Sequence, residues 1–157
     1  MTPAINLAKK NRIVHTVHEY AHDAKSESYG LEAAEKLGVP GERVFKTLVV
    51  NVDNQSLAVG VVPVTSMLSI KLIAKAVGAK KATMAEQSDV ERSTGYVLGG
   101  VSPMGQKKRL KTIIDSSARN FDTIYVSTGR RGLEIELSPE DLRIIVNDVF
   151  DAICQRL

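Results

Sequence analysis

The chain has 157 residues, 43% of them hydrophobic and 25% charged, and its 21 Lys and Arg against 18 Asp and Glu give a net charge of +3. This balance is typical of an ordinary soluble globular protein, and the mild basic excess is compatible with a phosphate-bearing partner. No apolar run approaches the roughly 18 residues of a membrane span, and the N-terminus, basic at Lys9, Lys10 and Arg12, lacks a signal-peptide core. We therefore expect one cytoplasmic domain over residues 1–157.

The first half of the chain alternates helical and extended patterns. Thr2 followed by Pro3 indicates a helix start, and Asp53-Asn54-Gln55 indicates a reversal that joins two strands into an antiparallel hairpin. The expected helices cover residues 4–11 and 28–38, and the expected strands cover residues 13–20, 44–52 and 56–64.

The second half repeats this mixture. Helices are expected over residues 69–78, 85–93 and 142–156, a short polar helix or turn over 116–120, and strands over 80–84, 111–115, 123–127 and 133–137. The last helix has a strong start signal in Ser138-Pro139. Together these elements predict an α+β fold: a mixed, largely antiparallel curved sheet or barrel of about seven strands with short flanking helices.

Lys46 is the one charged residue in the apolar, β-branched run of residues 44–52. In an extended chain it shares its face with aliphatic side chains only. Removing an ammonium from water is costly unless it meets an anion or hydrogen-bond acceptors, so Lys46 is a candidate site residue. The alternative is a lysine near a strand end whose stem covers apolar surface while its head reaches water.

Residues 95–105 hold four glycines and a proline. A backbone this open can approach a ligand closely and offer N–H donors to an anion or a carbonyl. The spacing follows neither a P-loop nor a dinucleotide fingerprint, and a plain glycine-rich turn is the alternative. Basic residues after this loop and on a hairpin tip favour contact with nucleic-acid phosphates: Lys107, Lys108, Arg109, Arg130 and Arg131.

Three histidines and the one cysteine are the residues to consider for metal binding and nucleophilic catalysis. His15, His18 and His22 lie close together in the sequence, but in a strand the first two point to opposite faces and no tetrahedral set is completed. Cys154, placed in the expected C-terminal helix, has no local feature that lowers its pKa. We therefore expect no metal, no other cofactor and no catalytic thiol.

Five stretches resemble a known family: Thr-Pro-Ala at 2–4, Val-Phe-Lys-Thr-Leu at 44–48, Ser-Thr-Gly-Tyr at 93–96, the glycine-rich segment 99–110 and Arg-Gly-Leu at 131–133. They are similar to the YbaK/EbsC family of free-standing bacterial deacylases of mischarged Cys-tRNA(Pro). That family is related to the editing domain inserted in bacterial prolyl-tRNA synthetases. The resemblance covers nearly the whole chain, and its most specific parts are the lysine strand and the Gly-x-x-Pro-x-Gly loop.

The resemblance implies hydrolysis of the aminoacyl ester on the terminal adenosine of tRNA(Pro), with prolyl-tRNA synthetase as a partner. Lys46 would neutralise phosphate, and the backbone at Gly100 would stabilise the developing oxyanion. No protein nucleophile is needed, because the thiol of a cysteinyl ester can attack its own carbonyl. The resemblance thus suggests substrate-assisted chemistry.

Carried over position by position, the resemblance implies a pocket that binds the aminoacyl group. Its expected residues are Tyr20, Tyr29, Lys46, Thr47, Gly99 or Gly100, Ser102, Pro103, Gly105, Ser127 and Glu134. The family has Phe where Tyr29 stands and Asp where Glu134 stands, so the size and polarity of the inner pocket differ here. Two alternatives remain open: a deacylase of another mischarged tRNA such as Ala-tRNA(Pro), and a non-catalytic module that binds tRNA or synthetase.

Overall fold

The computed structural model describes residues 1–23, 25 and 29–155, and leaves out the side chain of Tyr29. The helices in this part of the chain are α1 Pro3–Lys10, α2 Tyr29–Leu37, α3 Ile70–Ala76, α4 Gln87–Thr94 and α5 Pro139–Val146, with short 3-10 helices η1 Gly41–Arg43 and η2 Ser116–Asn120. The strands are β1 His15–Glu19, β2 Phe45–Val52, β3 Ser56–Pro63, β4 Ala82–Met84, β5 Lys111–Asp115, β6 Ile124–Arg130, β7 Leu133–Leu137 and β8 Val149–Asp151. No helix among these residues is long and apolar enough to cross a membrane.

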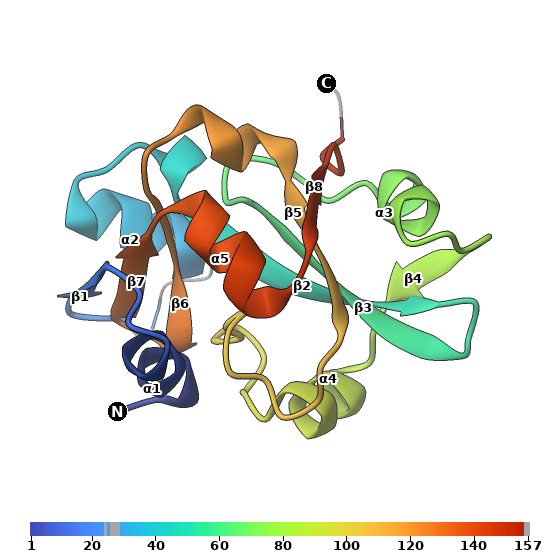
Figure 1. Ribbon diagram of the computed structural model, residues 1–157, viewed down its shortest axis with the longest axis horizontal. Helices are drawn as coiled ribbons and strands as arrows, with labels where there is room; N and C mark the ends of the chain where they lie inside the picture. Colours follow the sequence, from blue (N-terminus) through green and yellow to red (C-terminus); the bar gives the residue numbers. More distant parts are fainter. Residues whose placement is uncertain (24, 26–28, 156–157) are drawn as a thin grey trace.

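The strands form two sheets, as Figure 1 shows. One has three strands in the order β1-β7-β6, and the other has five in the order β4-β2-β3-β5-β8. All pairings are antiparallel except those of β5 with β3 and with β8. The predicted α+β class with a mixed, largely antiparallel sheet is confirmed, but the described strands do not close into a barrel. Among the described residues, the backbones of the two sheets are joined by one parallel bridge, between Val44 and Tyr125.

The predicted hairpin of β2 and β3 is confirmed, with Val52 opposite Ser56 across its turn. Asp53 and Asn54 both have left-handed backbone angles, with φ of 53° and 55°. Such angles match the right-handed twist of the flanking strands, and Asp and Asn tolerate them better than most residues. The turn therefore sets the register that places Lys46 opposite Val62.

The prediction of a helix over residues 142–156 is wrong. Helix α5 starts at the predicted place, with the Ser138 side chain accepting from the Asp141 N–H, but it ends at Val146. Its C-cap is Asn147, whose φ of 57° is left-handed. The chain then forms β8, parallel to β5. Asp115 supports this strand by accepting the N–H of Ile153 at 3.0 Å, so backbone groups that a helix would have satisfied locally find partners in the sheet.

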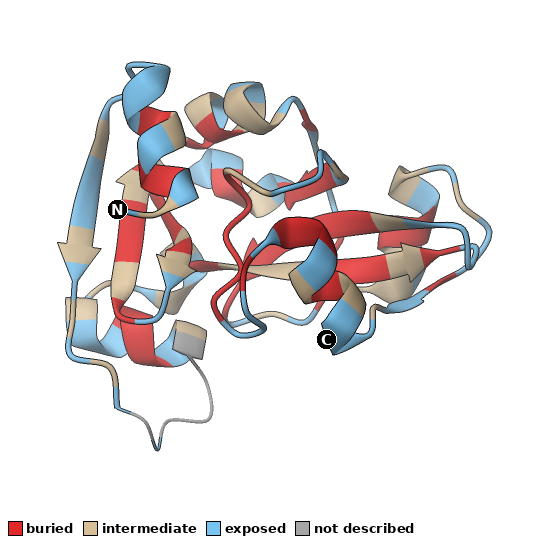
Figure 2. Ribbon diagram, turned by 90° about the horizontal axis from the view of Figure 1, so that it is seen from below, coloured by how far each residue is buried: buried red, intermediate tan, exposed pale blue. Residues whose placement is uncertain are grey.

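The core lies on both faces of β2 and β3. Phe45, Val49 and Val61 pack into a cluster with α1, β6 and β7, whereas Val50 and Val62 pack into a second cluster toward α3. Because successive side chains of a strand point to opposite faces, strands buried on both sides are almost continuously apolar. Figure 2 shows this distribution, with buried residues concentrated in the strands and on the inward faces of the helices.

Candidate active site

A cavity of about 360 Å³ opens where the two sheets diverge. Strand β4 pairs with β2 only at residues 50–52, so the earlier part of β2 presents an edge toward β6 and β7. Residues 45–49 all line the cavity, together with Ser127 of β6 and Glu134 of β7. Five consecutive residues of one strand can line one cavity only at an edge, where both faces of the strand meet the opening.

Glu134 is the most perturbed acid of the cavity. It lies directly opposite Ser127 across the β6–β7 pair, and only 6% of it is exposed. Burial raises the pKa of its carboxyl to about 8, so the neutral acid is the main form at neutral pH and can donate a hydrogen bond. Tyr20 also lines the cavity, and burial, followed by the charge of Glu134, raises the pKa of its hydroxyl to about 12.

Lys46 and Thr47 leave β2 on opposite faces, and both line the cavity. Lys46 is half-buried and forms no ion pair with any described residue, and burial lowers the pKa of its amine while the nearby Cys154 raises it. The Thr47 hydroxyl oxygen is buried without a hydrogen-bond partner among the described residues. A buried polar atom without a partner is costly, so both side chains are suited to a ligand that would supply one.

The glycine-rich loop contributes less to this cavity than the sequence led us to expect. Gly99 lines it, whereas the Gly100 N–H donates to Val97 O at 3.0 Å. Ser102 is fully buried and its hydroxyl accepts the N–H of Met104. Pro103 and Gly105 instead line a second cavity of about 230 Å³ beside α1 and α5.

Gly105 is required by packing. Its φ is +70°, and an added Cβ would lie 2.7 Å from the carbonyl carbon of Pro3. The loop is held further by the Tyr96 hydroxyl, which donates to Met104 O at 2.6 Å. The Pro-x-Gly half of the loop therefore docks against the start of α1, and its other half faces the first cavity.

The five predicted nucleic-acid-binding residues fall in two places. Arg130 and Arg131 line the first cavity, where Arg131 donates to Leu98 O at 3.3 Å and Arg130 lies 3.9 Å from Glu19. Lys107, Lys108 and Arg109 are exposed, and the latter two line the second cavity. Of the five predicted residues, the two hairpin arginines are therefore the ones that lie at the first cavity.

The three histidines belong to no group of described residues that could hold a metal ion. Tyr29 begins α2, but its side chain lies outside the described residues. His15 contacts Ile13 O, whereas His18 and His22 contact Glu136 and Glu32, at 2.8 and 2.6 Å.

Cys154 does not lie in the C-terminal helix that the sequence predicted. Cys154 forms an isolated β-bridge with Leu68 and is not helical. Burial, followed by the charge of Asp115, raises the pKa of this thiol to about 11. The protonated thiol is a poor nucleophile.

Sequence reasoning missed the apolar part of the cavity lining. These residues lie at the end of β4 and just after it, on α4, and in the loop that follows α4: Met84, Ala85, Val90, Leu98 and Val101. Nothing in their local pattern separates a residue that lines a cavity from one that fills the core. Two exposed apolar residues of this set, Met84 at 52% and Leu98 at 47%, are the nearest to a signal.

Residues 26–145 match the sequence profile described as an aminoacyl-tRNA editing domain. The chain belongs to the aminoacyl-tRNA editing domain family. The editing domain is 36% identical, over 95% of its length and 90% of the relative's, to the Enterococcus faecalis protein named "Putative Cys-tRNA(Pro)/Cys-tRNA(Cys) deacylase EbsC". It is also 30% identical to the uncharacterised YwhH of Bacillus subtilis, over 71% of this chain and 70% of that one.

Solved structures share the fold of the editing domain. One described as "a putative trans-editing enzyme for prolyl tRNA synthetase" matches with a TM-score of 0.83 at 18% identity, covering 98% of this chain and 93% of the other. A hypothetical protein matches with a TM-score of 0.87 at 22% identity, covering 98% and 99%. The resemblance to YbaK/EbsC proteins is thus confirmed. Editing removes an amino acid from tRNA, so this domain is an aminoacyl-tRNA deacylase.

Proposed function

We propose that this editing domain deacylates Cys-tRNA(Pro) with the help of the substrate's own thiol, and that residues 1–157 act as one domain. The proposal is carried by the composition of the first cavity, which holds a half-buried lysine and a buried acid. Among the described residues that line it, no side chain is poised as a nucleophile. The Ser127 hydroxyl accepts the Gly129 N–H at 3.0 Å, and its neighbour Glu134 is mainly protonated at neutral pH, so this pair lacks a general base.

Lys46 supplies the positive charge of the proposed site. An ammonium removed from water binds phosphate oxygens more strongly than one on an open surface. Arg130 and Arg131 would hold the preceding part of the acceptor strand at the cavity mouth. A tRNA end placed this way would bring its 3′ ester to the polar lining between β2 and β7.

The chemical step forms one bond and breaks one. The sulfur of the cysteinyl group attacks the carbonyl carbon, the bond from that carbon to the ribose oxygen breaks, and the proton of the thiol ends on the ribose hydroxyl. The product is a cyclic thioester that water later opens. A backbone donor at the glycine-rich loop would stabilise the oxyanion; because Gly100 donates to Val97 O, its use requires the loop to release that bond.

The alternative substrate is Ala-tRNA(Pro). It is favoured by Glu134, which takes more room in the cavity than the family's Asp and would leave less for the aminoacyl side chain. A small apolar side chain gains little discrimination in such a pocket. Whichever ester is used, prolyl-tRNA synthetase is proposed as the partner that supplies selectivity for the tRNA body.

The test compares the rates at which the purified protein deacylates Cys-tRNA(Pro), Ala-tRNA(Pro) and Pro-tRNA(Pro). We expect selective loss of cysteine, no loss of proline, and a fall of at least about 100-fold in Lys46→Ala. Lys71→Ala, in which an exposed helical lysine is removed, is the matched control. Replacing the cysteinyl group by a seryl group tests the thiol, because only thiol assistance predicts that seryl-tRNA(Pro) persists.

Each other outcome removes a part of the proposal. Loss of alanine in place of cysteine would move the protein to the alternative substrate. Binding of tRNA without deacylation of any ester would leave a non-catalytic module. Full activity in Lys46→Ala would refute the role of that lysine.

A further inference from the structure

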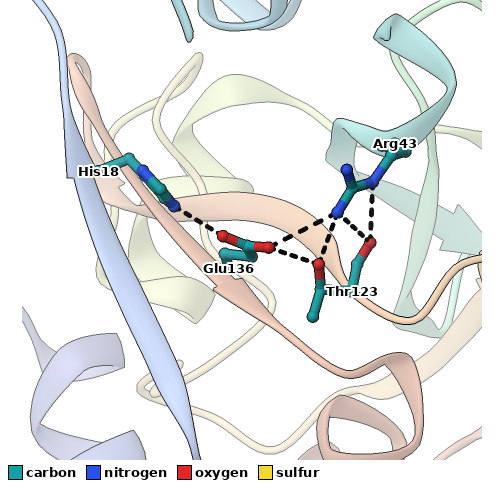
Figure 3. Close-up of polar contacts among 4 residues, drawn as sticks. All are labelled: His18, Arg43, Thr123 and Glu136. Atoms are coloured by element: carbon teal, nitrogen blue, oxygen red, sulfur yellow. Dashed lines mark hydrogen bonds and ion pairs between the residues drawn. The ribbon is translucent and has the colours of Figure 1, made fainter. Parts of the chain in front are cut away.

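Arg43 stands at the centre of a polar cluster that lies outside the cavity lining. Its guanidinium donates twice to Thr123 O, at 3.1 and 3.2 Å, and once to the Thr123 hydroxyl, at 2.6 Å. It also lies 3.5 Å from a Glu136 carboxylate oxygen and 5.1 Å from the centre of the Tyr125 ring. Figure 3 shows four side chains of this cluster converging from η1, β1, β7 and the residue before β6: Arg43, His18, Glu136 and Thr123.

Glu136 is fully engaged within this cluster. The Thr123 hydroxyl donates to one of its oxygens at 2.5 Å, and His18 Nε2 contacts the other at 2.8 Å. The hydrogen bond from Thr123, followed by those of His18 and the charge of Arg43, lowers the pKa of Glu136. The carboxylate is therefore ionised at neutral pH and holds the Arg43 guanidinium and the His18 ring in place.

The cluster adjoins the point where the two sheets touch. Arg43 precedes Val44, which forms the bridge to Tyr125. From that bridge the strands diverge around the cavity: Lys46 follows two residues after Val44, and Ser127 two residues after Tyr125. At about 3.3 Å per residue along a strand, a change at the bridge reaches these side chains within about 7 Å.

We propose that Arg43 is a positioning residue, which holds β2 against β6 and β7. It thereby places Lys46 and Thr47 across the cavity from Ser127 and Glu134. The geometry suits arginine and not lysine, because a planar guanidinium offers several donors in fixed directions and stacks on an aromatic ring, whereas an ammonium is a single flexible point of charge. None of the residues in the cluster lines the cavity, so Arg43 acts through the strands and touches no substrate.

Arg43→Lys is the variant that tests this role, because lysine keeps the positive charge but lacks the several fixed N–H donors of the guanidinium. The kinetic part of the test rests on the proposed function. We expect kcat on the cysteinyl ester to fall at least about tenfold, since a displacement of about 1 Å can cost up to 100-fold. KM should change less than about threefold. Loss of the guanidinium's hydrogen bonds to Thr123 should also lower the thermal midpoint, so both proteins are assayed well below it.

Arg119→Lys is the matched control. Arg119 also belongs to a 3-10 helix and lies over an aromatic ring, 5.4 Å from the centre of Phe150, but it is exposed and not in the cavity lining. It should keep the kcat of the wild type. A kcat of Arg43→Lys within about twofold of the control would overturn the proposal, as would a loss of activity that disappears when the assay is cooled to restore folding.

A second readout needs no catalysis and separates this inference from the proposed function. The pKa of Glu134 can be followed by carbon NMR of its carboxyl, with Glu134→Gln to assign the signal. If Arg43 holds the strands together, Arg43→Lys lets water reach the cavity, and the pKa of Glu134 falls from about 8 toward the ordinary value of about 4.3. An unchanged Glu134 pKa would overturn the positioning role, even if the protein deacylates none of the esters tested.

Discussion

Two glutamates on one face of strand β7 have opposite surroundings, and their carboxyl pKa values are shifted in opposite directions. Glu134 and Glu136 are two residues apart on β7, so their side chains leave the same face. The pKa of Glu134 is raised to about 8 by burial alone, whereas that of Glu136 is lowered by Thr123, His18 and Arg43. One end of the face lines the cavity, and the other end belongs to a hydrogen-bonded polar cluster.

The difference shows which acid is available for chemistry. Glu136 accepts from Thr123 and pairs with His18 and Arg43, so it contributes to the position of the strands. Glu134 lines a cavity with Tyr20 and Ser127. Its neutral form can donate a hydrogen bond to a ligand, and a cationic ligand beside it would favour the carboxylate. Perturbed acids whose shift comes from desolvation in a cleft are candidates for function, and those in closed networks are candidates for structure.

The largest effect that would test this contrast is the pH dependence of stability set by Glu134. The folded state keeps a proton on this carboxyl between the unfolded pKa of about 4.3 and the folded pKa of about 8, so its contribution is present in acid and is lost as pH rises through that interval. The free energy of unfolding should fall by up to about 1.4 kcal/mol per pH unit there.

Urea unfolding of wild type and Glu134→Gln at pH 5, 6, 7 and 8 measures this effect. Because Gln does not titrate, the variant should gain stability relative to the wild type as pH rises. Parallel stability curves for the two proteins would mean that Glu134 is solvated in the folded state, and the contrast with Glu136 would disappear.

The next effect is the loss of stability in Glu136→Ala. Removing this carboxylate leaves Arg43 and His18 without their shared acceptor, and hydrogen bonds to charged groups are each worth about 1.5–3 kcal/mol. We expect unfolding to require about 2 kcal/mol less than in the wild type at pH 7. Glu140→Ala, which removes an exposed acid beside Arg143 on α5, is the control, and equal losses in both variants would show that the cluster is no stronger than a surface pair.

The smallest effect concerns the one thiol. Cys154 lies on the side of β2 toward α3, outside the first cavity, and its raised pKa keeps it protonated. Cys154→Ser should therefore deacylate within about twofold of the wild-type rate. Loss of activity in a variant with a wild-type thermal midpoint would assign this thiol a part in the reaction.

Local patterns in the sequence were enough for most of the elements. The Asp53-Asn54 turn predicted the hairpin, a nearly continuous apolar run predicted β2 with β3 as its partner, and alternating apolar residues predicted β7. Turn chemistry and side-chain period act over a few residues, which is why these local patterns were sufficient. The isolated lysine of β2 marked one wall of the cavity for the same reason. The family resemblance supplied Tyr20, Ser127 and Glu134, which also line it.

Contacts between distant segments determined the rest. The C-terminal residues after Asn147 became a strand because β5 offered backbone partners, and Pro103 and Gly105 turned away from the first cavity because α1 packs against their loop. Glu134 and Glu136 have the same local sequence environment, yet their pKa values move in opposite directions. Residue type and spacing set which groups a chain carries, but burial and charge depend on what the fold brings beside them.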